Sequence, residues 1–240
     1  MSDKIRLDKF LADMGIGTRS EVKDFIRKKR VLINDEIADS PSIKVNKKGD
    51  KVYFDEILVS YEEFEYYMLN KPQGVVSATK DKKYKTVVDL ISDKKRKDLF
   101  PIGRLDIDTE GLLVITNDGE LAHALLTPGK HVKKKYYVLV KGKVTSREIE
   151  LFATGLKIDT AFTAMPAILE IIKCDDISEV YVTIEEGKFH QIKRMFEAVD
   201  MSVIFLKRVS MGKLELDDNL KTGEFKKMTE DEIELLKDSF

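Results

Sequence analysis

Three carboxylates lie at alternate positions in the segment GRLDIDTEGLL, namely Asp106, Asp108 and Glu110. A spacing of two residues predicts that they share one face of an extended strand. Carboxylates held this close repel one another, so some of them must be exposed, paired with a cation or bound to a metal. A carboxylate in such a setting can act as a nucleophile or as a general acid or base.

A calcium-binding loop is the first alternative for this segment. DIDTEG matches an EF-hand loop as far as Gly111, but the twelfth position, which needs a glutamate, is Asn117. The residues before it, LLVIT, are apolar like a buried strand. We therefore expect no metal here. A strand with a polar entry loop accounts for LLVITNDG, but not for the acidic run that precedes it.

Two further segments hold residues that could carry chemistry or binding. In EEGKFHQIKRMF, polar residues follow a glycine turn at the expected start of a helix. One of them is His190, but a single histidine in such a place is more often structural than catalytic. In HVKKKYYVLV, a basic run precedes Tyr136 and Tyr137. Basic residues can hold phosphate, and an aromatic ring can stack on an extruded base. A solvated strand end with a core tyrosine explains the second segment equally well.

The N-terminal part of the chain predicts a compact unit of two helices and three short strands. Apolar residues at helical spacing predict a helix from Leu7 to Met14, and Thr18 with Glu21 predicts a capping box that opens a second helix. Three short strands follow at 31–34, 42–45 and 51–54. On the second helix four basic residues form one stripe: Arg19, Lys23, Arg27 and Arg30.

The rest of the chain is rich in strands. We expect strands at 66–70, 74–78, 112–116, 134–142, 167–172, 179–184 and 202–209, and helices at 86–92, 120–126, 146–155 and 190–199. Because the two kinds of element do not alternate regularly, the pattern predicts an α+β fold with a mixed, mostly antiparallel sheet. The acidic segment SYEEFE sets the expected boundaries: an N-terminal domain at 1–59, a linker at 60–65 and a second domain at 66–240.

Composition limits the class of protein. The 240 residues are 42% hydrophobic and 35% charged, and the one cysteine, Cys174, excludes intrachain disulfides and cysteine-rich metal sites. No apolar run reaches the roughly 18–20 residues of a membrane span, and the first residues lack the apolar region of a signal peptide. We expect a cytoplasmic protein with no membrane partner.

The net charge of −1 hides an uneven distribution. Residues 214–240 hold nine acidic residues and four lysines, whereas residues 19–30 hold six basic and two acidic residues, and 130–135 hold four basic residues and no acidic one. Local basic patches fit contacts with selected phosphates. By composition alone, ordinary solvated helix faces explain them as well.

Together these segments resemble known RNA-modifying enzymes. The N-terminal unit, IRLDKFLADMGIGTRSEVKDFIRKKRVLIND with SPSIKVNKKGDKV, resembles the S4 RNA-binding domain, except that Asp35 stands where that family usually has a glycine. LNKPQGVVSAT, GRLDIDTEGLLVITNDG, KKKYYV, PAILEI and EEGKFHQIKRMF, in this order, resemble the RsuA branch of the ribosomal RNA pseudouridine synthases. The resemblance runs over nearly the whole chain.

The resemblance implies roles for individual residues. Asp106 matches the nucleophile, Lys193 its basic partner and Tyr136 the tyrosine that stacks on the target base. Residues implied to contact RNA are Arg104, which helps to hold the flipped nucleotide, Ile192, which packs on the base, then His190, Gln191 and Arg194, and the stripe on the second helix.

The implied reaction isomerises uridine to pseudouridine. Because nothing is oxidised and no group leaves the site, we expect no cofactor and no metal. The implied partner is ribosomal RNA, within a pre-ribosomal small-subunit particle, and we expect a monomer. The C-terminal segment favours 16S rRNA. Two alternatives stay open: the same chemistry on 23S rRNA, and a non-catalytic S4-domain assembly factor, which would have no need of an aspartate in an RNA-facing cleft.

Overall fold

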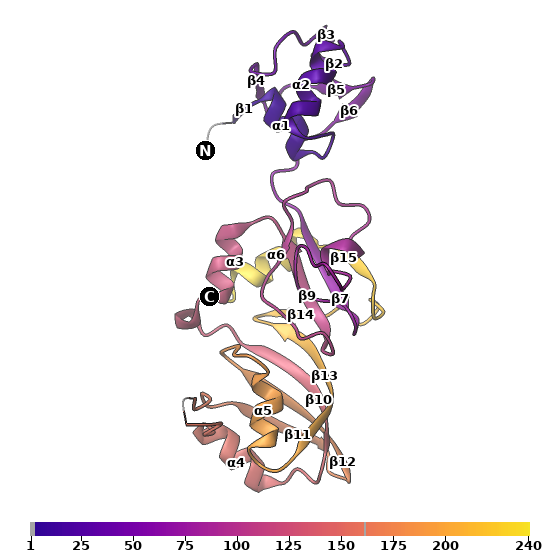
Figure 1. Ribbon diagram of the computed structural model, residues 1–240. Coiled ribbons are helices and arrows are strands. Elements are labelled where there is room, and N and C mark those ends of the chain that lie inside the picture. The colour runs from indigo at the N-terminus through magenta and orange to yellow at the C-terminus, as the bar shows by residue number, and fades with distance from the viewer. Residues whose placement is uncertain (1–2, 161) are drawn as a thin grey trace. The chain divides into compact units, whose positions relative to one another are not determined.

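The computed structural model describes residues 3–160 and 162–240, which divide into two compact units. The first unit comprises residues 1–65 together with 92–99, and the second comprises 66–91 together with 100–240 (Figure 1). The return of residues 92–99 to the first unit was not indicated by the sequence. It is fixed by Glu65, whose buried carboxylate accepts hydrogen bonds from the backbone N–H groups of Lys95 and Arg96.

The first unit contains both expected helices. Helix α2 opens with the predicted capping box, because the Thr18 hydroxyl accepts from the Glu21 N–H while the Glu21 carboxylate accepts from the Thr18 N–H. The three expected strands are present, and three more accompany them in two small sheets, β1-β4 and β3-β2-β5-β6. The elements are α1 (Leu7–Asp13), α2 (Arg19–Arg27), β1 (Lys4–Arg6), β2 (Val31–Ile33), β3 (Glu36–Ile37), β4 (Lys44–Asn46), β5 (Val52–Phe54) and β6 (Ile57–Val59).

Two of the three extra strands, β3 and β6, arise from tight hairpins. Asn34 and Asp35 both adopt positive φ, 49° and 72°, between β2 and β3, and Asp55 and Glu56 do the same, at 47° and 66°, between β5 and β6. Two successive residues with positive φ match the twist of a hairpin, and Asn and Asp tolerate this conformation better than most residues. Asp35 therefore forms the turn without the usual glycine.

The second unit is built on one nine-stranded sheet, which confirms the expected α+β class and the mostly antiparallel pairing. Its main path runs β11-β12-β10-β13-β9-β7-β15, with β14 on β13 and β8 on β9, and only β13 and β9 pair in parallel among the described residues. The strands are β7 (Tyr66–Lys71), β8 (Phe100–Pro101), β9 (Glu110–Thr116), β10 (Lys134–Lys141), β11 (Ile168–Lys173), β12 (Ile177–Ile184), β13 (Ser202–Met211), β14 (Leu214–Glu215) and β15 (Phe225–Lys227).

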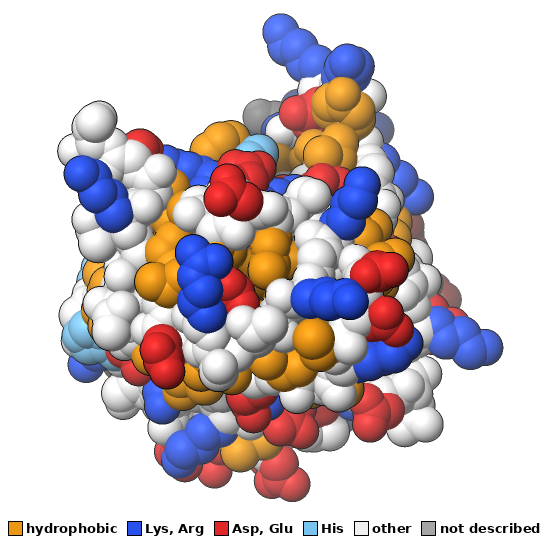
Figure 2. All heavy atoms as spheres, turned by 90° about the horizontal axis from the view of Figure 1, so that it is seen from below, with side chains coloured by type: hydrophobic (Ala, Val, Ile, Leu, Met, Phe, Trp, Pro, Cys, Tyr) orange, Lys and Arg blue, Asp and Glu red, His pale blue; other side chains and the backbone are white. Residues whose placement is uncertain are grey.

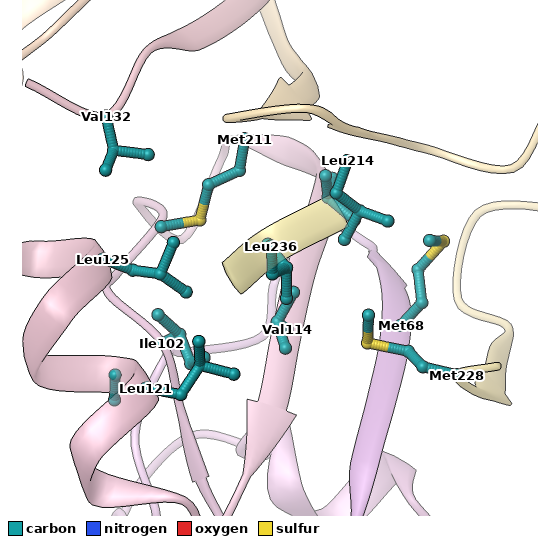
Figure 3. Packing of buried hydrophobic residues seen from close by; sticks show 12 residues of the cluster. Met68, Ile102, Val114, Leu121, Leu125, Val132, Met211, Leu214, Met228 and Leu236 are labelled. Carbon is teal, nitrogen blue, oxygen red and sulfur yellow. The ribbon is translucent and has the colours of Figure 1, made fainter. Parts of the chain in front are cut away.

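Helices cover the sheet in two groups (Figure 1). In one half, α3 and α6 share a hydrophobic core with β7, β9 and β13, where Leu121, Leu236 and Val114 meet (Figure 3). In the other half, α4 packs against α5, with the rings of Phe152 and Phe196 5.0 Å apart. The helices are α3 (Gly119–Leu126), α4 (Ser146–Thr154), α5 (Gln191–Glu197) and α6 (Glu230–Lys237), with 3-10 turns at Val88–Leu90 and Pro128–Lys130.

The parallel pair joins the two halves at a close approach that only glycine allows. Gly111 at the start of β9 has φ 103°, and a Cβ there would lie 2.2 Å from the carbonyl oxygen of Arg208 on β13. Arg208 is itself buried and donates from Nε to the carbonyl of Leu112, at 2.8 Å. Gly111 thus fixes the position of the loop that precedes β9.

Two expected elements are wrong. Residues 74–78 form no strand and make only an isolated bridge, Val76 to Thr86, because Ser77 turns its hydroxyl to the backbone of Leu105. The helix expected at 86–92 shrinks to one 3-10 turn, in which Thr86 and Asp89 bond each other's backbone. Among the described residues, no helix combines the length and the apolar character needed to cross a membrane.

Candidate active site

A hollow in the second unit brings together six of the residues singled out in the sequence. It lies beside the parallel pair of strands, and its lining draws on the loop before β9, on β10 and on the start of α5. The predicted site residues that line it are Arg104, Asp106, Tyr136, His190, Gln191 and Ile192. Residues more than 80 positions apart in the chain therefore converge on one place.

The loop that presents Asp106 is a turn, not a strand. The N–H of Thr109 donates to the carbonyl of Asp106 at 3.1 Å, and β9 begins only at Glu110. The expectation that Asp106, Asp108 and Glu110 share one face of a strand is therefore wrong: the turn separates the two aspartates from Glu110. Glu110 lies within 3.4 Å of the Thr222 hydroxyl, whereas both aspartates face Lys193.

Lys71, at the end of β7, holds this loop in place through hydrogen bonds. Its ammonium group is fully buried and donates to three backbone carbonyls, those of Pro72, Asp106 and Thr109, at 2.9–3.1 Å. Burial lowers the pKa of Lys71 to about 8, against the opposing effect of the nearby acidic side chains, which favour the charged form. At neutral pH the group therefore stays charged and has one N–H for each carbonyl.

The segment that follows Lys71 completes the support. The hydroxyl of Ser77 accepts from the N–H of Leu105 at 3.0 Å and donates to its carbonyl at 2.8 Å, and the N–H of Gly74 donates to the carbonyl of Ile107 at 2.8 Å. The segment LNKPQGVVSAT, residues 69–79, thus supports the Asp106 loop through these hydrogen bonds. The sequence drew attention to this segment only by resemblance, because lysines are mostly exposed and nothing in YYMLN predicts that the lysine after it is buried.

Two basic side chains lie around the Asp106 carboxylate, whose side chain is 29% exposed. Lys193 Nζ lies 3.7 Å from one oxygen and His190 Nε2 lies 3.6 Å from the other. Lys193 binds Asp108 more closely, at 2.6 and 2.8 Å, and this hydrogen bonding lowers the pKa of the Asp108 carboxyl. Lys193 therefore lies near Asp106 as expected, but its contact with Asp106 is longer than its contact with Asp108.

The register of β10 selects Tyr136 from the tyrosine pair. Side chains alternate across a strand, so Tyr136 faces the hollow while Tyr137 faces away. Tyr136 is 7% exposed, and its neighbours in the sheet are Val182 and Arg208. Tyr137 instead packs edge-on to Tyr181 and donates its hydroxyl to Glu179 at 2.8 Å.

Of the predicted site residues at the start of α5, some line the hollow and others hold the neighbouring loop. Ile192 is buried and lines the hollow. Gln191 is also buried, and its amide closes the preceding loop by donating to Glu186 and accepting from the Lys188 N–H. Arg194 does not line the hollow. It pairs with Asp159 and lies over the ring of Phe162.

The expected basic stripe of α2 belongs to the first unit and is partly neutralised. Arg27 pairs with Asp24 at 2.7 Å. Arg30, expected on the helix, lies beyond its end at Arg27; it pairs with Asp55 and lies over the rings of both Phe25 and Phe54. Arg19 and Lys23 remain exposed on the helix.

Two of the four lysines in the basic run before Tyr136 are held by contacts within the fold. Lys134 is buried, donates to the carbonyl of Val132, and has a pKa that burial lowers to about 8. Lys135 pairs with Glu170 and lies over the ring of Tyr181. On the face drawn in Figure 2, basic and acidic side chains are likewise interspersed. The run is therefore divided between two lysines held within the fold and two exposed ones, Lys130 and Lys133.

Comparison with known proteins identifies both parts of the chain. Residues 65–198 match the family model described as RNA pseudouridylate synthase, and residues 5–52 match the S4 domain. An uncharacterised RNA pseudouridine synthase of Bacillus subtilis is 45% identical over 97% of this chain and 98% of its own. The ribosomal small subunit pseudouridine synthase A of Haemophilus influenzae is 39% identical, with coverage of 97% and 99%.

A solved structure agrees over the same length. A crystal structure of a pseudouridylate synthase superposes with a TM-score of 0.68 at 38% identity, covering 97% of this chain and 99% of the other.

Proposed function

The chain belongs to the RNA pseudouridylate synthase family, and on that premise we propose that it isomerises one specific uridine of 16S rRNA, with Asp106 as the reacting carboxylate. The observation that supports this most strongly is the convergence of Asp106, Tyr136 and Ile192 on one hollow. A carboxylate, an aromatic ring and an aliphatic side chain around a small space suit a uracil ring and the sugar carbon attached to it.

The chemistry requires no external reactant. The bond between N1 of uracil and C1′ of the ribose breaks, the base turns, and a bond forms from C5 to C1′. The proton lost from C5 is balanced by the one gained at N1, so the product is an isomer. Asp106 serves either as the nucleophile that holds an intermediate or as the base that removes a sugar proton, and both roles need its ionised form.

The target base must first leave its stack, which costs a few kcal/mol. Stacking on Tyr136 offsets about 1–3 kcal/mol of this cost. Ile192 covers the base with apolar surface, and Arg104, exposed at the edge of the hollow, binds the phosphate of the flipped nucleotide. Lys193 keeps positive charge near the Asp106 carboxylate when the base displaces water from it, and His190 lies beside the other carboxylate oxygen.

The choice of 16S rRNA rests on the names of relatives, several of which are ribosomal small subunit pseudouridine synthases. We further propose that the substrate is a pre-ribosomal small-subunit particle in the cytoplasm and that the enzyme acts as a monomer. The exposed residues Arg19 and Lys23 of the S4 domain contact RNA backbone, with Arg27 and Arg30 available once their acidic partners release them.

Pseudouridine mapping of both ribosomal RNAs from cells that lack the protein tests this function. We expect one pseudouridine to disappear from 16S rRNA and none from 23S rRNA. Loss from 23S rRNA alone would transfer the same chemistry to the large subunit. An unchanged map of both RNAs, with altered ribosome assembly, would favour the non-catalytic assembly factor.

A further inference from the structure

A second hollow adjoins the first and shares part of its wall. Arg104, Leu105, Asp106, Gly187 and Lys188 line both. The remainder of the second lining is largely apolar and comes from residues outside the proposed uracil site, among them Val76, Ala78, Leu126 and Phe189. A ligand that occupies both hollows must therefore present one group to Asp106 and a second, mostly apolar group to the neighbouring space.

Phe189 gives the second hollow a surface for a planar group. Its ring stacks on the imidazole of His190, with centroids 3.7 Å apart and planes 19° from parallel. The side chain is nevertheless 72% exposed, the highest value among the exposed large hydrophobic residues of the described chain. One face of the ring is thus covered and held in place by His190, while the other lies open to solvent beside the hollow.

The shared wall carries the charge that a nucleotide backbone needs. Arg104 and Lys188 are exposed, and no described residue forms an ion pair with either side chain. Asp106 is the only acidic residue in the described lining of the second hollow. Two unpaired cations between two spaces suited to flat rings match a phosphodiester that links two nucleosides.

We propose that the second hollow binds the base of the nucleotide next to the target uridine in the same RNA strand, stacked on the open face of Phe189. This rests on the proposed function, because it requires the uridine in the first hollow. It makes Phe189 a binding residue that recognises the sequence neighbour of the target and keeps the strand extended across Arg104 and Lys188. Stacking accepts every base, so the contribution is to affinity more than to base identity.

Short dinucleotides separate the two hollows. The probes are UpA and ApU, each with a counterpart that has an abasic ribose in place of adenosine and another with an abasic ribose in place of uridine. Dissociation constants are measured by isothermal titration for the full chain and for Phe189→Ala, Phe189→Tyr and Phe240→Ala. Phe240 is a matched control, since it is an exposed phenylalanine of the same unit that lines neither hollow.

We expect adenine to tighten binding of at least one dinucleotide by roughly five- to 150-fold, the range for one base stacked on an aromatic ring. Phe189→Ala should abolish this gain without changing the affinity for the probe that lacks adenine, and Phe189→Tyr and Phe240→Ala should keep it. The proposal is overturned if adenine adds nothing in either dinucleotide, or if its gain survives in Phe189→Ala. If uracil adds nothing, the proposed uridine site fails and the second site with it, so the two failures are told apart.

Discussion

Lys193 makes its short contact with Asp108, with Nζ 2.6 and 2.8 Å from the two oxygens, and reaches Asp106 at 3.7 Å. The Asp108 side chain is 60% exposed and the Asp106 side chain 29%. The more solvated carboxylate thus holds the ammonium group, and the less solvated one lies in the hollow and faces it across a gap. We infer that Asp108 positions Lys193, and that Lys193 in turn favours the ionised form of Asp106 when a base covers the site.

Lys193→Met should lower turnover by orders of magnitude while leaving RNA affinity near normal. The methionine keeps much of the length of the side chain but removes the positive charge that compensates Asp106 when water is excluded. The measurement is the single-turnover rate on small-subunit particles from cells lacking the protein, beside a filter-binding constant for the same particles. Lys193→Arg is the control and should retain part of the rate. An unchanged rate in Lys193→Met would mean that Asp106 needs no such partner.

Tyr136 is expected to act through its ring face. Tyr136→Phe keeps the ring and should stay within about tenfold of the wild-type rate, whereas Tyr136→Ala loses a stacking contribution of about 1–3 kcal/mol and should fall further. The same single-turnover assay compares the two. Tyr137→Phe serves as the control, because that residue lies on the opposite face of β10. Equal losses in the Phe and Ala variants of Tyr136 would assign the effect to the hydroxyl.

Lys71 should titrate near pH 8. Its pKa in the folded chain is about 8 and the ordinary lysine value is 10.5. Between these values the unfolded chain binds a proton that the folded chain releases, so this group's contribution to the free energy of unfolding rises with pH across that window. Activity should change in the opposite direction, because the neutral amine has only two N–H groups for three carbonyls of the Asp106 loop.

A second buried lysine supplies the control for Lys71. Lys134 also has its pKa lowered to about 8, but it binds the carbonyl of Val132 and does not touch the Asp106 loop. Nitrogen-15 NMR of the lysine side chains should show two groups that titrate near pH 8, one lost in Lys71→Met and one in Lys134→Met. Only Lys71→Met should also remove most of the activity. Equal loss of activity in both variants would contradict a specific role in holding the loop.

Local signals in the sequence predicted much of the fold. The capping box of Thr18 and Glu21 marks the start of α2, and the long apolar strands at β9, β10, β12 and β13 lie where expected. Residues 74–78 were mistaken for a strand because VVSA has strand composition, whereas the Gly74 N–H and the Ser77 hydroxyl bond the Asp106 loop. Composition cannot reveal such a distant partner.

Several residues that line the hollow could be selected from the sequence, whereas their geometry could not. Asp106, Tyr136 and Ile192 were selected by resemblance, and the lining of the hollow includes all three. Spacing alone placed three carboxylates on one strand face, and the turn between Asp106 and Thr109 removes that arrangement. The contact of Lys193 with Asp108 joins residues 85 positions apart, so it depends on how α5 meets the loop, which no local pattern encodes.

Replacing each aspartate in turn tests the central claim most directly. Asp106→Asn and Asp108→Asn are compared in two assays. The first is their ability to restore the missing pseudouridine in cells lacking the protein, and the second is their single-turnover rate on small-subunit particles from those cells. We predict that Asp106→Asn restores nothing and has no measurable rate, while Asp108→Asn restores the site with a rate within about tenfold of wild type. Restoration by Asp106→Asn, or a loss of activity confined to Asp108→Asn, would contradict the assignment of Asp106 as the reacting carboxylate.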